Sequence, residues 1–233
     1  MNGNLIYPYA LNIRRILCFE QISDYCKVIS VERQARIALY RFDRDKVRSL
    51  TAELLLRYAL EEQFGMDCHT ITFRYTKNGK PLLANSNVYF NLSHSSDWVV
   101  CAVGKNEIGI DVEELRQTDY KDIYGAFAET EIRLLNNLES NARGTTFYKL
   151  WTLKESYIKY CGTGLLYPFS NFSVDVQPDG EAKLIQTANG VADVRFYSRK
   201  LDEAHWYALC IPSEAQAAEI RFVAKQILFG CAI

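Results

Sequence analysis

Two segments of the chain place charged side chains at spacings that suit metal and phosphate chemistry. Asp111 and Glu113 lie two residues apart in an otherwise apolar stretch, which puts both carboxylates on one face of a strand. Further along, Glu155 and Lys159 lie four residues apart, so they share one face of a helix. Three acids and a lysine that converge in this way could hold a hard metal ion and a phosphate ester.

Each half of this pattern also has an ordinary explanation. A lone Asp-x-Glu more often marks two solvated acids at a strand end, and Glu155 with Lys159 is compatible with a surface ion pair worth roughly a few tenths of a kcal/mol. The context favours the metal site, because the apolar run from Ile108 makes the strand central. All candidate ligands are oxygens, with no histidine or cysteine at ligand spacing, which favours magnesium over zinc.

The helix that carries Glu155 must turn its apolar side inward. That side is formed by Leu150, Trp151, Leu153, Tyr157 and Ile158. We therefore expect Lys154, Glu155 and Lys159 to remain available to a cleft. There, Glu155 could ligate a metal or accept a proton from an incoming hydroxyl, and Lys159 could offset the charge that builds on a transferring phosphate.

His94 follows a predicted strand, after Ser93 and before further small hydroxyl residues. A single histidine is more often structural than catalytic. The alternative is a phosphate site in which His94 and Ser93 donate hydrogen bonds.

Basic residues concentrate between Lys27 and Arg57, a region that contains two predicted helices. Most of them are expected on solvated helix faces, but a forked guanidinium of Arg33, Arg36 or Arg48 could meet a terminal phosphate. Lys80, in the turn before Pro81, is either a hairpin lysine or another phosphate partner.

Composition excludes several classes of protein. The 233 residues are 48% hydrophobic and carry a formal net charge of −1, so no overall positive field recruits nucleic acid or an anionic membrane. A nuclease is disfavoured because the bases are confined to one short region. The seven cysteines form no Cys-x-x-Cys pair and are expected to be reduced thiols. No segment has the form of a signal peptide or the length of a membrane span, and a cytoplasmic location is expected.

Periodicity predicts an α+β chain of two similar-sized lobes that meet near residue 105. The predicted helices are Val31 to Phe42, Asp45 to Phe64, Asp119 to Phe127, Glu129 to Leu138 and Thr146 to Tyr160. The predicted strands are Thr70 to Tyr75, Val88 to Leu92, Trp98 to Val103, Ile108 to Glu113, Phe172 to Val176, Ala182 to Gln186, Val194 to Ser198 and Trp206 to Ile211. The site is expected at the junction of the lobes.

With these segments in hand, the sequence resembles the 4′-phosphopantetheinyl transferases of the two-lobed, surfactin-synthetase-activating type. The matching segments occur in the family's order and spacing: Gly79-Lys80-Pro81, Phe90 to Ser95, Gly109 to Glu113, Trp151 to Lys159 and Gly162 to Leu165. The segments that contain Asp111 and Glu155 are the specific ones, whereas Gly-Lys-Pro and the basic helices are weak by themselves. The resemblance covers roughly residues 29 to 176.

The resemblance implies magnesium-dependent transfer of the phosphopantetheine arm of coenzyme A to a serine of an acyl or peptidyl carrier protein, with release of 3′,5′-ADP. It implies two similar lobes related by a pseudo-twofold axis, each with a small, mostly antiparallel sheet. Residues 1–105 would bind the nucleotide of coenzyme A, and residues 106–233 would carry the metal and catalytic residues. One chain would supply both halves of the site, so a monomer is expected.

The resemblance assigns the family's functional positions to individual residues of this sequence. Asp111, Glu113 and Glu155 match the magnesium ligands, and Glu155 also matches the base for the carrier serine, directly or through water. Lys159 would steady the pyrophosphate, and His94 would hold a phosphate of coenzyme A. The other residues at nucleotide-binding positions are Arg33, Arg36, Arg48, Ser49, Lys80 and Ser93. Arg33 and Arg36 stand where the best-known member has lysines, which keeps the charge and leaves the contact geometry open.

The same residues are compatible with a second function. The alternative function is a catalytically idle module that binds coenzyme A or a nucleotide, although the intact acids and Lys159 disfavour it. The carrier and its pathway, in fatty-acid or secondary-metabolite biosynthesis, are not identified by the sequence. The exposed side of residues 117–138 is our candidate for the surface that docks the carrier.

Overall fold

The computed structural model describes residues 4–116, 125–164, 167–176, 182–187 and 193–230. The chain divides into two compact units. The first unit comprises Met1–Asn106 and Ala217–Ile233, and the second comprises Glu107–Gln216. Both units combine helices with small sheets whose main strands run antiparallel, so the chain has the expected α+β fold.

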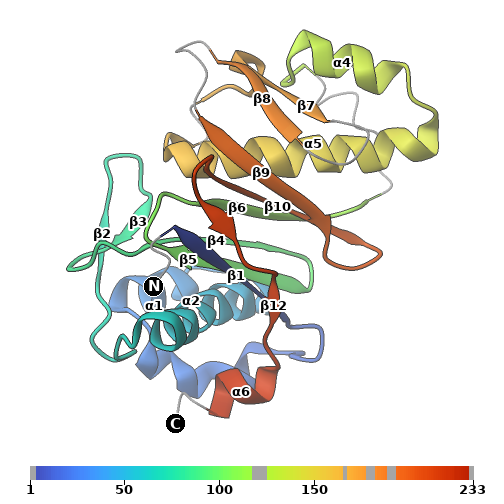
Figure 1. The fold of residues 1–233 in the computed structure, drawn as a ribbon. Coiled ribbons are helices and arrows are strands. Elements are labelled where there is room, and N and C mark those ends of the chain that lie inside the picture. The colour runs from blue at the N-terminus through green and yellow to red at the C-terminus, as the bar shows by residue number, and fades with distance from the viewer. Residues whose placement is uncertain (1–3, 117–124, 165–166, 177–181, 188–192, 231–233) are drawn as a thin grey trace. The chain divides into compact units, whose positions relative to one another are not determined.

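The first unit packs helices against one face of a sheet (Figure 1). Its helical elements are η1 (Phe19–Val28), α1 (Val31–Ala38), α2 (Asp43–Phe64) and α6 (Lys225–Gly230). Its strands are β1 (Leu5–Asn12), β2 (Phe73–Tyr75), β3 (Pro81–Leu83), β4 (Tyr89–Ser95), β5 (Trp98–Gly104) and β12 (Arg221–Phe222), together with β11 (Gln216–Ala217), whose first residue belongs to the second unit. The sheet runs in the order β11-β1-β5-β4, with β12 also beside β1. Strands β2 and β3 form a separate hairpin.

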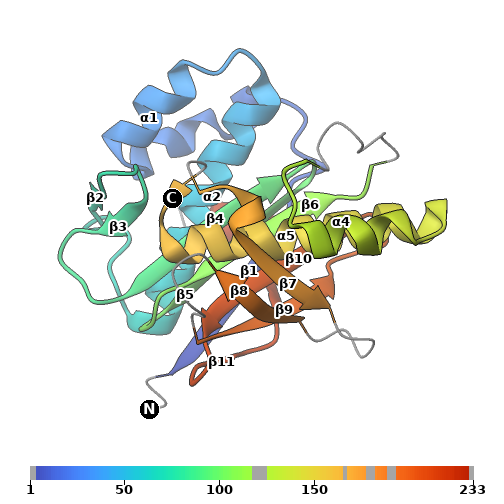
Figure 2. The ribbon, with the colours of Figure 1, turned by 90° about the horizontal axis from the view of Figure 1, so that it is seen from above.

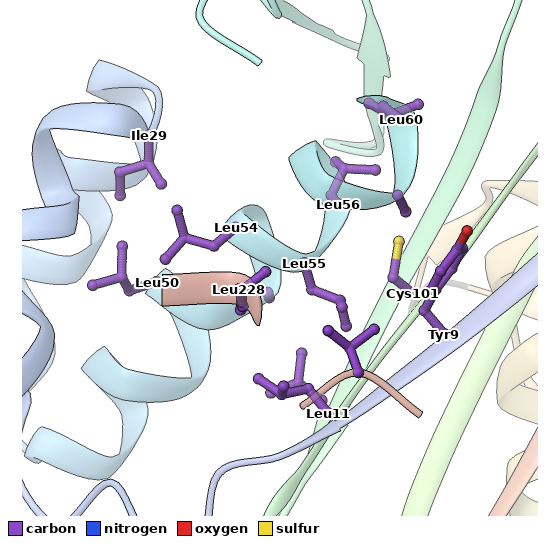
Figure 3. Close-up of a cluster of buried hydrophobic side chains, with 14 of the residues drawn as sticks. Tyr9, Leu11, Ile29, Leu50, Leu54, Leu55, Leu56, Leu60, Cys101 and Leu228 are labelled. Carbon is purple, nitrogen blue, oxygen red and sulfur yellow. The ribbon is translucent and has the colours of Figure 1, made fainter. Parts of the chain in front are cut away.

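The core of the first unit lies between α2 and this sheet. Figure 3 shows Leu55 of α2 near side chains of the sheet, Tyr9, Leu11 and Cys101, with Ile29 and Leu228 in the same cluster. Valines and a cysteine at alternate positions of β5 (99, 101 and 103) belong to the cluster, so this is the face that α2 covers.

The second unit places one long helix across a three-stranded sheet (Figure 2). Its helical elements are α4 (Glu129–Asn136), α5 (Ser140–Cys161) and η3 (Phe169–Asn171). Its strands are β6 (Gly109–Glu114), β7 (Phe172–Val176), β8 (Ala182–Thr187), β9 (Val194–Lys200) and β10 (His205–Pro212). The sheet has the order β6-β10-β9, and β7 pairs with β8. Helix α5 ends where Gly162 takes a left-handed conformation with φ of 66°.

The structure differs from the predicted elements mainly at the two ends of the chain. No element was predicted for Leu5–Asn12, yet this stretch is strand β1, inside the sheet. Its apolar residues are continuous, as in a strand buried on both faces, and so show no alternation. The end of the chain was expected in the second lobe, but Ala217–Ile233 belongs to the first unit because β12 pairs with β1 and Leu228 enters its core.

Two predicted helices also differ. Helix α5 begins at Ser140, not at Thr146. Of the helix expected over residues 119–127, residues 119–124 lie outside the described part, and residues 125–127 form a turn and a bend. In the described residues, no helix is both long enough and apolar enough to span a membrane.

Candidate active site

Strand β6 turns alternate residues toward helix α5. A Cβ atom added to Gly109 would overlap the carbonyl oxygen of Ser156 and the backbone nitrogen of Tyr160, so strand and helix touch at backbone level there. Because side chains alternate along a strand, Asp111 and Glu113 lie on the same face as Gly109. Both acids are thus on the side of the sheet that meets α5.

Helix α5 brings its own charges to this face. Lys159 Nζ donates a hydrogen bond of 2.6 Å to Asp111 Oδ1. Asp111 is only 3% exposed, whereas the Lys159 side chain is 26% exposed. The lysine therefore links a buried acid of the strand to the more accessible side of the helix.

Glu155 lies one helical turn before Lys159, and the charges of Asp111 and Lys159 both affect its pKa. Burial raises the pKa of Glu155, the negative charge of Asp111 raises it further, and Lys159 opposes both. Glu155 and Asp111 are therefore close enough to repel each other. A cation placed between them would relieve that repulsion.

The donor set fits a hard divalent ion. Asp111, Glu113 and Glu155 supply carboxylate oxygens, the ligand type that Mg²⁺ prefers. They are not gathered around one point, since the only trio of His, Cys, Asp or Glu in the described residues with ligand atoms within 4.8 Å of one another lies elsewhere. Their side chains would have to turn toward an ion in order to share it.

Lys154 was expected in the cleft, and this was wrong. Its side chain is 0% exposed, and Nζ donates to both carboxylate oxygens of Glu131 at 2.8 Å and to the carbonyl oxygen of Phe172 at 2.6 Å. Position 154 follows Leu150 by four residues and Leu153 by one, so it falls on the buried stripe of the helix.

Glu131 completes a buried polar cluster that the sequence analysis missed. It also accepts hydrogen bonds from the backbone nitrogens of Ala128 and Val174, at 2.9 and 2.8 Å. One carboxylate thus ties α4, α5 and β7 together. Burial lowers the pKa of Lys154 to about 8, against the opposing charge of Glu131.

In the first unit, the structure brings Arg33 and Ser49 together. Arg33 Nη1 lies 3.4 Å from Ser49 Oγ, and Arg33 Nε lies 3.4 Å from Glu53 Oε2. Glu53 is buried and also accepts bonds from Ser30 and Arg57. Glu53 was not among the predicted site residues, although its position inside the leucine-rich stretch of α2 and four residues before Arg57 was a usable signal.

Arg48 supports the turn that follows His94. Its Nε donates to the carbonyl oxygen of Ser96 at 2.9 Å, and its Nη1 contacts Asp45 Oδ1 at 2.9 Å. Ser96 has a φ of 49°, a left-handed conformation that few residues other than glycine adopt. The arginine thus holds a strained turn between β4 and β5.

Ser93 and His94 lie on opposite faces of the sheet. His94 pairs with Val99, whose side chain is in the core that α2 covers, so the exposed His94 is on the α2 side. Ser93 pairs with Val100 and is buried on the other face. The structure therefore groups His94, but not Ser93, on the face where Arg33, Arg48 and Ser49 are found.

Arg36 and Lys80 complete the residues expected to bind nucleotide. Arg36 is exposed in the last turn of α1. Lys80 is half-buried at the end of the β2–β3 turn, where its backbone nitrogen donates to Thr76 Oγ1 at 3.1 Å. The role of both side chains in nucleotide binding stays a prediction.

Comparison with known proteins shows that both units match models of one protein family. A model of the 4′-phosphopantetheinyl transferase N-terminal domain matches residues 18–106, and a model of the 4′-phosphopantetheinyl transferase superfamily matches residues 107–211. The chain belongs to the 4′-phosphopantetheinyl transferase superfamily. The two matches meet where the structure divides its units, between residues 106 and 107.

Individual relatives match over most of their length. The 4′-phosphopantetheinyl transferase psf-1 of Bacillus pumilus is 34% identical over 205 residues, which are 86% of this chain and 87% of the relative. The 4′-phosphopantetheinyl transferase gsp of Aneurinibacillus migulanus is 34% identical over 78% of this chain and 76% of its own. A solved holo-[acyl-carrier-protein] synthase of Thermotoga maritima aligns with 45% of this chain and 61% of its own, at 23% identity and a TM-score of 0.38, a likeness too partial to bear on function.

The surface proposed for the carrier is only partly described. Residues 117–124 lie outside the described part of the chain. Phe127 is 2% exposed and packs in the core of the second unit, so it is excluded from any docking surface. Leu134 on α4 is 41% exposed and is compatible with one.

Proposed function

We infer that this chain transfers the 4′-phosphopantetheine arm of coenzyme A to a serine hydroxyl of an acyl or peptidyl carrier protein and releases 3′,5′-ADP. The observation that carries this inference is the charged cluster of Asp111, Lys159 and Glu155 on β6 and α5, in a chain that belongs to this family. A module that only bound coenzyme A would not need a buried acid and a lysine held in contact. The idle binding module therefore stays the weaker alternative.

The second unit would hold the metal. Asp111, Glu113 and Glu155 supply oxygens for Mg²⁺, and the bound ion would neutralise charge on the pyrophosphate. Glu155 accepts the proton of the carrier serine hydroxyl, so that the serine oxygen attacks the β-phosphorus of coenzyme A as the bond to the leaving phosphate breaks. Lys159 donates hydrogen bonds to the pyrophosphate oxygens. To reach them, its partly exposed ammonium group must turn away from Asp111.

The first unit would bind the nucleotide. Arg33, Ser49 and His94 lie on the α2 side of its sheet and would donate hydrogen bonds to phosphate oxygens of coenzyme A. The further candidates on this unit are Arg36, Arg48, Lys80 and Ser93. Ser93 would have to act from the other face of the sheet, because its side chain points away from His94.

The direct test is the mass of a carrier domain. The protein is incubated with coenzyme A, MgCl₂ and an apo carrier, and the carrier is weighed by mass spectrometry. If the protein is a transferase, the carrier gains the mass of one phosphopantetheine group. A control without the enzyme shows no gain. If coenzyme A binds and several different apo carriers gain nothing, the idle binding module is the better description.

Magnesium should stabilise the folded protein through the three acids. At a concentration of Mg²⁺ ten times its Kd, binding should add about 1.4 kcal/mol to the free energy of unfolding. The measurement is thermal unfolding in MgCl₂ against KCl at equal ionic strength. Asp111→Asn should lose the difference, whereas Asp175→Asn, which changes an exposed acid on β7, should keep it. If Mg²⁺ stabilises both variants equally, Asp111 is not a ligand of the ion.

Arg48→Ala should weaken coenzyme A binding by about tenfold or more, since a hydrogen bond to a charged group is worth about 1.5–3 kcal/mol. Titration calorimetry with coenzyme A measures the change. Arg44→Ala is the matched control, because Arg44 contacts Asp97 in the same turn but is not expected to touch the nucleotide. If both variants weaken binding equally, Arg48 acts only by holding the turn.

A further inference from the structure

A second group of metal-binding side chains lies in the first unit, in the loop after α2. One ligand atom each from Asp67, Cys68 and His69 lies within 4.8 Å of the others. Asp67 and His69 are exposed and Cys68 is half-buried, so the group is open to solvent. It offers an oxygen, a sulfur and a nitrogen, a donor set unlike the carboxylates of the second unit. These three consecutive residues were not among the metal ligands predicted from the sequence.

The turn in this loop explains only part of the arrangement. The backbone nitrogen of Thr70 donates to the carbonyl oxygen of Asp67 at 3.0 Å, and the backbone nitrogen of His69 donates to Asp67 Oδ1 at 2.9 Å. Aspartate is favoured at the first position of such a turn for this reason. The turn has no requirement for a thiol at 68 or an imidazole at 69, so two of the three donors are unexplained by backbone structure.

A buried arginine, Arg57, holds the backbone of this loop through hydrogen bonds. Arg57 donates through Nη1 to the carbonyl oxygen of Cys68 and, at 3.4 Å, through Nη2 to that of Ile71. Arg57 is itself paired with the buried Glu53 at 2.6 Å. The backbone that carries the three donors is therefore fixed to α2, and little further ordering is needed for them to act together.

We propose that Asp67, Cys68 and His69 form a binding site for a zinc-class divalent ion, with a remaining position filled by water. Zinc accepts thiolate, imidazole and carboxylate ligands at about 2.0–2.3 Å, which spaces tetrahedral ligands about 3.3–3.8 Å apart. The observed group needs only small side-chain movements to reach that spacing. Magnesium does not suit this group, because it prefers oxygen ligands.

The experiment uses Co²⁺ as a spectroscopic probe on the full-length protein, without coenzyme A or carrier. CoCl₂ should produce a near-ultraviolet thiolate-to-cobalt charge-transfer band that saturates at one ion per chain, and ZnCl₂ should abolish it by displacement. Cys68→Ser should remove the band. His69→Ala should weaken Co²⁺ binding by at least about tenfold.

Matched variants separate this site from the other thiols and from the catalytic acids. Cys161→Ser, which changes an exposed cysteine of the second unit, and Asp111→Asn should both keep the band. An excess of MgCl₂ should not displace the cobalt. The proposal is overturned if the wild-type protein gives no band, if the band survives in Cys68→Ser, or if His69→Ala binds Co²⁺ as tightly as the wild type. None of these readouts depends on transferase activity.

Discussion

Glu155→Gln should lower kcat by about 10²- to 10⁴-fold, the contribution typical of a general base, with coenzyme A binding largely retained. The amide is close in shape to the carboxylate but cannot accept the serine proton, and it is also a weaker ligand for Mg²⁺. The measurement is the rate of carrier modification at saturating coenzyme A and carrier, together with the Kd for coenzyme A from calorimetry.

The control for this change is Glu139→Gln, which alters an exposed acid at the other end of the same helix and should leave kcat unchanged. A fall in coenzyme A affinity with little change in kcat would show that Glu155 binds the substrate and does not act in the chemical step. A kcat equal to that of Glu139→Gln would remove Glu155 from the mechanism.

Lys154→Met should destabilise the second unit by about 3–5 kcal/mol. Methionine fills similar space, but it leaves the buried carboxylate of Glu131 without its counter-charge, and breaking a buried ion pair from one side has about this cost. Urea unfolding, followed by fluorescence of the tryptophans, measures the change. Lys183→Met, at an exposed position of β8, should change the free energy of unfolding by less than about 0.5 kcal/mol.

A double variant identifies the cause of the loss. Glu131→Gln removes the charge and keeps an oxygen for the backbone nitrogens of Ala128 and Val174. Combined with Lys154→Met, it should recover part of the lost stability. If the double variant is no more stable than Lys154→Met alone, the loss comes from packing around position 154 and not from the unpaired carboxylate.

Sequence patterns located the strand and the helix of the second-unit cluster because each has a strong period. The alternation around Asp111 and the helical spacing of Glu155 and Lys159 depend only on local geometry, and the structure has both elements. The contact between Lys159 and Asp111 did not follow from either period. It depends on the close approach at Gly109, where the missing side chain lets strand and helix backbones meet.

The burial of charged side chains was the feature that the sequence predicted least well. Helical spacing places Lys154 on the buried stripe of α5, but its counter-charge Glu131 lies 23 residues away in the chain and did not follow from local spacing. Glu53 is similar, because its partner Ser30 comes from outside its own helix. The start of α5 was missed for a different reason: Gly144 and Thr145, just before the predicted start, have weak helix propensity.

The return of Ala217–Ile233 to the first unit makes the second unit an insertion within it. Every residue of the second unit precedes β12 and α6, whose Leu228 belongs to the core of the first. During synthesis from the amino terminus, the insertion can complete its own core first. The surrounding unit needs the segment after residue 216 to finish its core, so Asp111, Glu113 and Glu155 can be in place before the first unit has finished folding.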